Sequence, residues 1–241
     1  MPDSVVDIAL VYPELLGTYG DGGNALVLAR RLTKRGIAAR VVEVGINEPV
    51  PRAAEIYLLG GGEDAPQFTA LDALRTSGAL NQAADAGSVV LAVCAGFQLI
   101  GTSLVDADGG SLPGLGLVDA ITTRAPKRLV GEVAVRDEAL GTGWIVGFEN
   151  HRGVTAIESG VPLGPRQPEL GCATDGVVHG HVVGTYLHGP VLARNPRFAD
   201  QLLEWVVGPL EPFVDPQADL LHAERCTATV GAGRWSRRFR R

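Results

Sequence analysis

One cysteine stands where a short apolar strand turns into a helix. The segment Ser88-Val-Val-Leu-Ala-Val-Cys94-Ala-Gly-Phe-Gln-Leu-Ile-Gly101 surrounds it with small residues, at Ala92, Ala95 and Gly96. Such a strand–turn–helix is a nucleophile elbow, a crowded turn that lifts one side chain above the sheet edge. The partial positive charge of a helix N-terminus would favour the thiolate. A merely buried cysteine would not need this context, so Cys94 is predicted to be a nucleophile.

Two other segments could complete a site for attack on a carbonyl group. Three glycines, Gly60-Gly61-Gly62, follow an apolar strand, where backbone N–H groups can point at a developing oxyanion. An ordinary glycine-rich turn is the alternative. His188 follows the apolar run 182–187 and is placed to act as a base for Cys94.

The remaining histidines are weaker candidates for chemistry. They are His151, His179, His181 and His222. His179 and His181 lie two residues apart and would share one face of a strand, but no third metal ligand is obvious. We therefore predict that these two histidines face solvent and that the chain has no metal site.

The elements that would position these groups alternate between strands and helices. Strands are expected at residues 5–11, 39–44, 55–59 and 88–93, and helices at 24–34, 68–86, 94–101 and 196–207. Further strands are expected at 129–135, 144–148, 177–181 and 183–187, with little helix between them. This order predicts an α/β fold: a largely parallel sheet, helices on both faces and extra C-terminal strands. Residues 1–210 would form one domain, and residues 211–241 a C-terminal extension with a basic tail.

Composition and charge narrow the class of protein. Hydrophobic residues make up 46% of the chain, enough for a full core, and the net charge of −6 argues against nonspecific nucleic-acid binding. Five arginines fall in the last eight residues. This basic tail is interpreted either as a solvated end of the chain or as a contact for an anionic partner or membrane surface. No secretory signal or apolar run of about 20 residues is seen, and three scattered cysteines fit a reducing cytoplasm.

Together the three segments resemble the class I glutamine amidotransferases. The order is the same: a glycine-rich loop, then Cys94-Ala-Gly-Phe-Gln98, then the late histidine. Gly147-Phe-Glu-Asn-His151 and Tyr186-Leu-His188-Gly look like the branch that includes cobyric acid synthase. Tyr19-Gly-Asp-Gly-Gly-Asn24 is similar to a segment of that branch's amidotransferase subunits of lipid II isoglutaminyl synthase.

This resemblance implies a glutaminase. Cys94 would attack the amide carbon of L-glutamine to form a glutamyl thioester, and His188 would protonate the departing ammonia and then activate water. Backbone N–H groups near Gly61 and Ala95 would form the oxyanion hole, with Gln98 in the substrate site beside the elbow. Arg128 falls where the family places an arginine for glutamine binding, although a solvated basic loop is the alternative.

One departure leaves the third catalytic residue open. Most class I enzymes carry a glutamate two residues after the histidine, and here that position is Pro190. This agrees with the cobyric acid synthase branch. Either Glu149 or a residue of a partner chain could orient His188.

The ammonia must be used by another polypeptide. The chain has no Gly-x-x-x-x-Gly-Lys-[Ser/Thr] segment, and neither of its two lysines, Lys34 and Lys127, follows a glycine loop. No cofactor is expected in this chain. The resemblance implies a Mur-ligase-like partner that binds ATP and Mg²⁺ and amidates lipid II at the cytoplasmic face of the membrane. The alternatives are a stand-alone cysteine hydrolase of the DJ-1/PfpI type and a non-catalytic scaffold subunit.

Overall fold

The computed structural model describes residues 5–105, 109–167 and 174–236. These described residues form eleven strands, which are, in chain order, β1 (Val6–Val11), β2 (Ala39–Val44), β3 (Ile56–Leu59), β4 (Val89–Val93), β5 (Ser103–Val105), β6 (Ser111–Pro113), β7 (Ala120–Arg136), β8 (Trp144–Ile157), β9 (Val161–Gln167), β10 (Thr174–His179) and β11 (Val182–Thr185). The helices are α1 (Pro13–Leu16), α2 (Gly23–Thr33), α3 (Asp64–Ser77), α4 (Ala79–Asp85), α5 (Ala95–Ile100), α6 (Val191–Arg194), α7 (Pro196–Val207) and α8 (Pro216–Ser236).

All eleven strands of the described residues belong to one sheet with a parallel half and an antiparallel half. The strand order is β2-β1-β3-β4-β11-β10-β9-β7-β5-β6, and β8 pairs with β7. Strands β2, β1, β3, β4 and β11 are mutually parallel. Beyond β11 the pairing of β10, β9, β7 and β8 is antiparallel. The predicted α/β fold with extra C-terminal strands is therefore confirmed.

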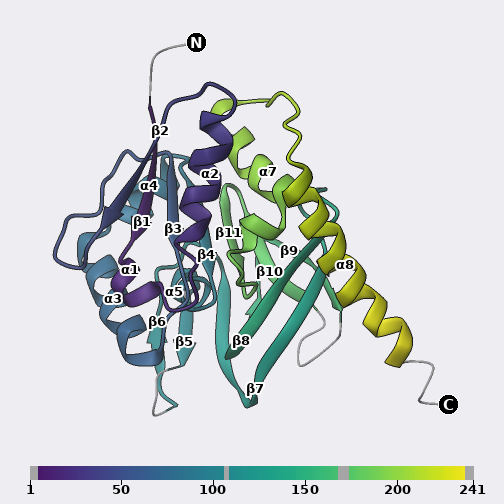
Figure 1. Ribbon diagram of the computed structural model, residues 1–241. Helices are drawn as coiled ribbons and strands as arrows, with labels where there is room; N and C mark the ends of the chain where they lie inside the picture. Colours follow the sequence, from purple (N-terminus) through teal and green to yellow (C-terminus); the bar gives the residue numbers. More distant parts are fainter. Residues whose placement is uncertain (1–4, 106–108, 168–173, 237–241) are drawn as a thin grey trace.

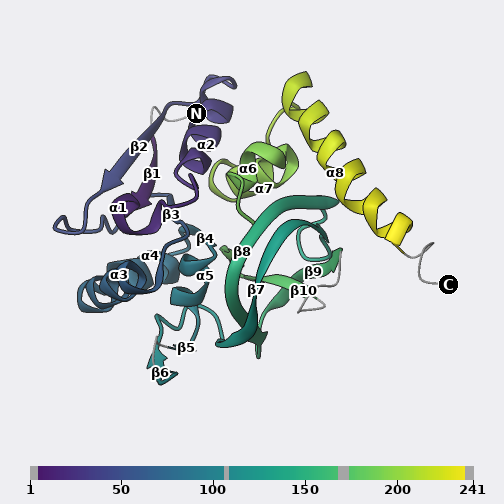
Figure 2. The same cartoon turned by 60° about the horizontal axis from the view of Figure 1, so that its bottom comes forward.

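Helices cover both faces of the parallel strands (Figure 1), with α2 and α7 on one side and α3, α4 and α5 on the other (Figure 2). This explains the apolar strand sequences, because β3 (IYLL) and β4 (VVLAV) are buried along their whole length. Strands covered on both faces read as continuous apolar runs rather than as alternating ones.

The antiparallel strands are longer than predicted. β7 and β8 form a curved ribbon (Figure 2), whereas the apolar runs marked only residues 129–135 and 144–148. The rest of β7 is largely polar and exposed, and the register shifts between Arg124 and Leu129. β9 was missed because Pro162, Gly164 and Pro165 interrupt its sequence.

The predicted helix at 68–86 is two helices, because Gly78 adopts a left-handed φ of 60° and separates α3 from α4. Helix α8 was not predicted, although it packs against α6, β7 and β8. Its sequence shows no sustained apolar spacing of three and four residues. No helix in the described residues is long and apolar enough to cross a membrane.

Candidate active site

Cys94 occupies a strained turn at the carboxyl end of β4. Its backbone has φ 53° and ψ −102°, a conformation that a residue other than glycine rarely adopts. Gly96 must be small because a Cβ atom there would lie 2.7 Å from the Cβ of Leu59. The Ala95 amide makes a hydrogen bond to the Cys94 side chain. The strand, the turn and the small neighbours together form the elbow expected from the sequence.

The structure brings His188 to the same edge of the sheet. β11 pairs with β4, with Thr185 opposite Val93, and the Cys94 amide donates a hydrogen bond to the Thr185 carbonyl oxygen (2.8 Å). His188 follows three residues later, and its backbone pairs with Phe148 of β8. The exposed fractions of Cys94 and His188 are only 4% and 2%.

Asp21, which sequence reasoning missed, occupies the position beside His188 that a third catalytic residue would take. Asp21 Oδ2 lies 2.8 Å from His188 Nδ1, and both side chains are buried. Since a carboxylate only accepts, Nδ1 carries the proton and Nε2 is left as the acceptor for the proton of a nucleophile. Within the described residues Nε2 is buried without a hydrogen-bond partner. Asp21 belongs to the segment Tyr19-Gly-Asp-Gly-Gly-Asn24. The sequence feature that could have indicated its role is a carboxylate in the turn-rich loop after the first strand, at the same edge of the sheet as Cys94.

Glu149 is therefore the wrong candidate for the third position. It lies in a separate buried cluster, where it pairs with Arg166 and contacts His151 Nε2 at 3.1 Å. No residue of a partner is needed to orient His188 either, because Asp21 of the same chain does so.

Gly61 has a different role from the predicted one. Its amide donates to Asp21 Oδ2 (2.9 Å), so this N–H is not free to bind an oxyanion. Instead Gly61 makes room for the base, because a Cβ atom there would lie 2.5 Å from His188 Cε1. Of the two predicted backbone donors, the Ala95 amide is the one that faces the sulfur.

Replacing Gly61 with alanine should therefore damage catalysis. The added methyl group would displace His188, and a shift of about 1 Å in a catalytic group can cost ~10²-fold in rate. We expect a loss of that order in kcat for glutamine hydrolysis. Gly45→Ala is the matched control, because a Cβ atom there meets only ordinary contacts at 3.6 Å or more. Equal activity in the two variants would show that His188 tolerates the displacement.

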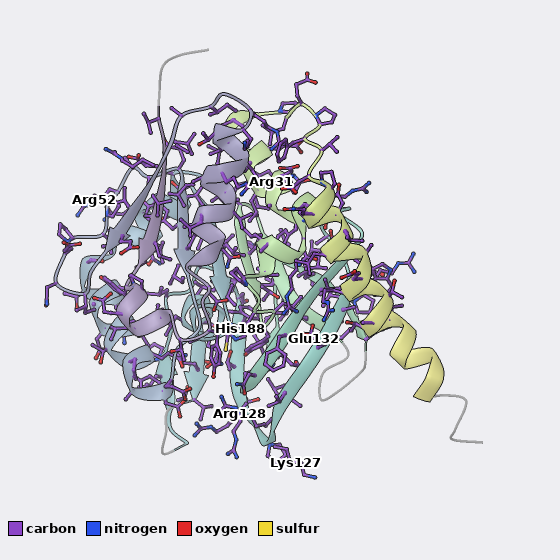
Figure 3. The ribbon with its side chains drawn as sticks, in the orientation of Figure 1. Arg31, Arg52, Lys127, Arg128, Glu132 and His188 are labelled. Atoms are coloured by element: carbon purple, nitrogen blue, oxygen red, sulfur yellow. The ribbon has the colours of Figure 1, made fainter. Side chains whose placement is uncertain are left out.

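Gln98 and Arg128 are the predicted substrate-site side chains outside the turn at Cys94 and the glycine loop. Gln98 is on α5, and its side-chain oxygen accepts a hydrogen bond from Gln67 Nε2 (3.1 Å). Arg128 lies at the bend of β7 next to Lys127, below His188 in Figure 3. Its guanidinium donates to the Tyr19 hydroxyl (3.0 Å), and the Tyr19 ring lies 4.5 Å from the His188 ring. Arg128 is thus held near His188 through Tyr19.

The other histidines stay outside the site. His181 contacts the Gly87 carbonyl oxygen (2.9 Å) and stacks on Trp205, while His179 is exposed. Within the described residues no three His, Cys, Asp or Glu side chains are grouped as metal ligands.

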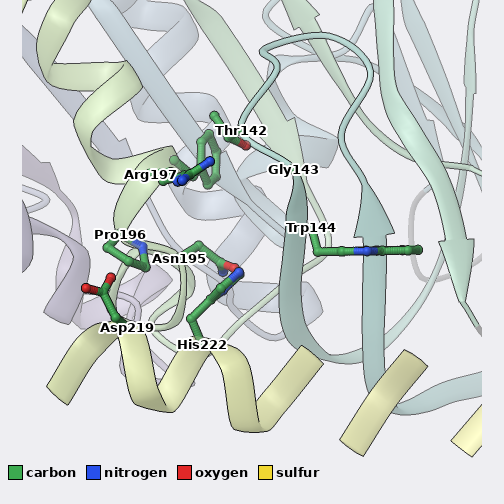
Figure 4. Close-up of a pocket in the computed structure, with 9 residues that line it drawn as sticks. Thr142, Gly143, Trp144, Asn195, Pro196, Arg197, Asp219 and His222 are labelled. Atoms are coloured by element: carbon green, nitrogen blue, oxygen red, sulfur yellow. The ribbon is translucent and has the colours of Figure 1, made fainter. Parts of the chain in front are cut away.

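A cavity of about 300 Å³ lies between α8 and the start of α7 (Figure 4). Trp144, Asn195, Arg197 and His222 line it, and it includes none of the predicted site residues.

Burial keeps the resting cysteine protonated. Burial first, and then the charge of Asp21, raise the pKa of the Cys94 thiol to about 12, against smaller lowering effects of the Ala95 amide and Arg128. The expected thiolate is therefore not favoured, because α5 has only six residues and full burial outweighs its N-terminal charge.

This pKa predicts how alkylation depends on pH. The thiolate fraction should grow about tenfold per pH unit throughout the range below the folded pKa. Alkylation of Cys94 by iodoacetamide should thus keep rising from about pH 7 to about pH 10, as measured by peptide mass spectrometry. In the denatured chain it should level off near the ordinary cysteine pKa of about 8.5. A plateau below about pH 8 in the folded protein would mean that the resting cysteine is already ionised.

The fold and the site together are those of a cysteine-dependent glutamine amidotransferase. The comparison with known protein families supports the same class. The profile of the CobB/CobQ-like glutamine amidotransferase domain matches residues 7–196. The chain belongs to this family.

Within the family, the chain is similar to subunit GatD of lipid II isoglutaminyl synthase (glutamine-hydrolyzing). It is 35% identical to the Staphylococcus aureus (strain N315) protein over 202 residues, which covers 78% of this chain and 79% of the relative. The Streptococcus pneumoniae protein is 32% identical over 209 residues, covering 82% and 79%. A probable cobyric acid synthase of Methanopyrus kandleri is 37% identical over 188 residues, 70% of this chain but only 37% of that longer protein.

Two solved structures share the fold. One described as a glutamine amidotransferase has a TM-score of 0.56 and 22% identity, and it covers 84% of this chain and 99% of its own. A glutamine amidotransferase from Thermotoga maritima has a TM-score of 0.55 and 14% identity, with 95% and 94% covered. At these identities the likeness concerns the fold alone.

Proposed function

We propose that this chain is the glutaminase subunit of a lipid II isoglutaminyl synthase. It hydrolyses L-glutamine and passes the ammonia to a Mur-ligase-like partner, MurT. The proposal rests mainly on one observation: Cys94 in its strand-to-helix turn lies at the same edge of the sheet as His188, and the Asp21 carboxylate orients His188. The similarity to GatD over about four-fifths of both chains supports the choice of acceptor.

The reaction begins with transfer of the Cys94 thiol proton to His188 Nε2 as the sulfur attacks the amide carbon of glutamine. With a pKa near 12, the thiol needs a base at the moment of attack rather than before it. The Ala95 N–H stabilises the oxyanion that forms. When the C–N bond breaks, His188 returns the proton to the nitrogen, so that ammonia leaves and a glutamyl thioester remains.

The second half of the reaction releases glutamate. His188 Nε2 takes a proton from water, and the hydroxide attacks the thioester carbonyl. The carbon–sulfur bond breaks, and the sulfur recovers its proton from His188. Asp21 stabilises the imidazolium in both halves, because its carboxylate stays bonded to Nδ1.

Amide synthesis belongs to the partner. The ATP-dependent step, with Mg²⁺, would activate the D-glutamate carboxylate of the lipid II stem peptide on MurT, and ammonia from this chain would convert it to D-isoglutamine. The heterodimer would act in the cytoplasm, at the inner face of the membrane, during peptidoglycan synthesis. The division into a domain of residues 1–210 and an extension of residues 211–241 stays a prediction, and the last five residues lie outside the described ones.

The test separates the two half-reactions. The chain alone should release ammonia from glutamine but should form no amide product with ATP, Mg²⁺ and lipid II. With the Mur-ligase-like subunit, lipid II should be amidated with glutamine as the only nitrogen source. A complex that carries Cys94→Ala should amidate lipid II only when an ammonium salt is added. Amidation by the isolated chain, or glutamine-dependent amidation by the Cys94→Ala complex, would contradict the proposal.

A further inference from the structure

The Tyr19 hydroxyl joins three segments beside His188: the turn before α3, strand β7 and strand β8. It accepts hydrogen bonds from Arg128 Nη2 (3.0 Å) and Asn150 Nδ2 (3.3 Å), and it donates one to Glu63 Oε1 (3.3 Å). Asn150 Oδ1 also accepts from Arg128 Nε. The Tyr19 hydroxyl oxygen therefore holds the Arg128 guanidinium and the Glu63 carboxylate close to each other. The Tyr19 ring lies between this charge pair and the His188 ring.

Neither of these two charges is used in an ion pair. The neighbouring residues Arg124 of β7 and Asp64 of α3 form a direct ion pair with each other. Over the described ranges, by contrast, Arg128 and Glu63 have no oppositely charged partner within ion-pair distance. Both side chains are exposed, so their charges remain available to a ligand that enters the site.

We propose that Glu63 binds the α-ammonium group of glutamine, next to the Arg128 guanidinium that the family resemblance already assigns to the α-carboxylate, with Tyr19 fixing the spacing between the two charges. The inference rests on the proposed glutaminase function and assigns a specificity residue to the same site. The ammonium and carboxylate of a free amino acid sit on one carbon, so they need two opposite charges close together. The structure supplies such a pair around a single hydroxyl.

The position of the pair fits the length of the substrate. Two methylene groups separate the α-carbon of glutamine from its amide carbon, so the charged end lies a short way from the sulfur. Tyr19 spans a similar gap, with its ring against His188 and its hydroxyl at the charge pair. Both charges are near enough to affect the Cys94 thiol: Arg128 lowers the pKa of the thiol and Glu63 raises it. The site would thus select free L-glutamine over amides that lack either charge.

The experiment compares L-glutamine with glutaramate, which has the same amide and carboxylate but no α-amino group. Ammonia release is measured for the full chain and for Glu63→Gln. We expect Glu63→Gln to raise the KM for glutamine roughly 10-fold, the loss typical of one charge-assisted hydrogen bond. The kcat should stay within about threefold, and kcat/KM for glutaramate should be unchanged. Competitive inhibition by L-glutamate should weaken by the same factor, whereas inhibition by glutarate should not change.

Asp64→Asn is the matched control, because it removes the adjacent carboxylate, which Arg124 already pairs with; it should leave the preference for glutamine intact. Equal losses for glutamine and glutaramate in Glu63→Gln would overturn the proposal, and so would an unchanged KM for glutamine. Failure of the full chain to release ammonia from glutamine would instead contradict the glutaminase function.

Discussion

Cys94→Ala should abolish ammonia release from glutamine, with a loss of at least ~10³-fold, while the protein stays folded. Losses of this size or larger are typical when a catalytic nucleophile is removed. The strained backbone at Cys94 should tolerate the change, because alanine needs less room than cysteine in the buried turn. Activity is measured by coupled ammonia detection, and folding by circular dichroism and thermal unfolding.

His188→Ala should nearly match Cys94→Ala, because nucleophile and base act as one unit. His179→Ala is the matched control, since His179 is exposed on β10, away from the site; it should keep most activity. Substantial glutamine hydrolysis by folded Cys94→Ala would refute the assignment of the nucleophile. A fully active His188→Ala would refute the assignment of the base.

Asp21→Asn should lower kcat by roughly 10²- to 10⁴-fold, the range seen when the acid of a catalytic triad is replaced. Asparagine nearly preserves the shape of Asp21 but removes the charge that stabilises the imidazolium. It can also turn its NH₂ group toward His188 Nδ1, which would favour the wrong tautomer. The KM for glutamine should change little, because Asp21 contacts His188 and Gly61 rather than the entrance.

A double variant shows whether Asp21 acts through His188. Adding Asp21→Asn to His188→Ala should cost little more than His188→Ala alone, because a residue that orients the base has no role once the base is gone. Losses that multiply would mean that Asp21 contributes independently, for example by holding the glycine loop through the Gly61 amide.

The sequence predicted the parallel half of the fold and the placement of Cys94 and His188 at one edge of the sheet, because both depend on local patterns. β1, β3 and β4 are short, largely apolar runs between turn residues, and the elbow needs a strand, a cysteine and small neighbours within 14 positions. His188 follows an apolar run in the same way. Parallel strands end at a common edge, so these local signals also placed Cys94 and His188 together.

The details that failed depend on how distant loops meet. Asp21 and His188 are separated by 167 positions, and only the folded loop after α1 brings the carboxylate to Nδ1. Glu149 points instead into the buried cluster with Arg166, a partner on β9, which was itself not predicted. The pKa of Cys94 likewise depends on burial by the whole surrounding structure.

The most direct test of the account is to identify the covalent intermediate. The protein is mixed with L-glutamine, quenched in acid during turnover, digested and analysed by mass spectrometry. We predict a glutamyl group on the peptide that contains Cys94, released by hydroxylamine as a thioester should be, and absent from Cys94→Ala. A glutamyl adduct on another residue would contradict this prediction. The Gly61→Ala and Asp21→Asn variants should accumulate the adduct more readily, because the base that serves deacylation is impaired in them. Turnover by the wild-type protein, with no adduct on Cys94 in any of the three proteins, would also contradict the prediction.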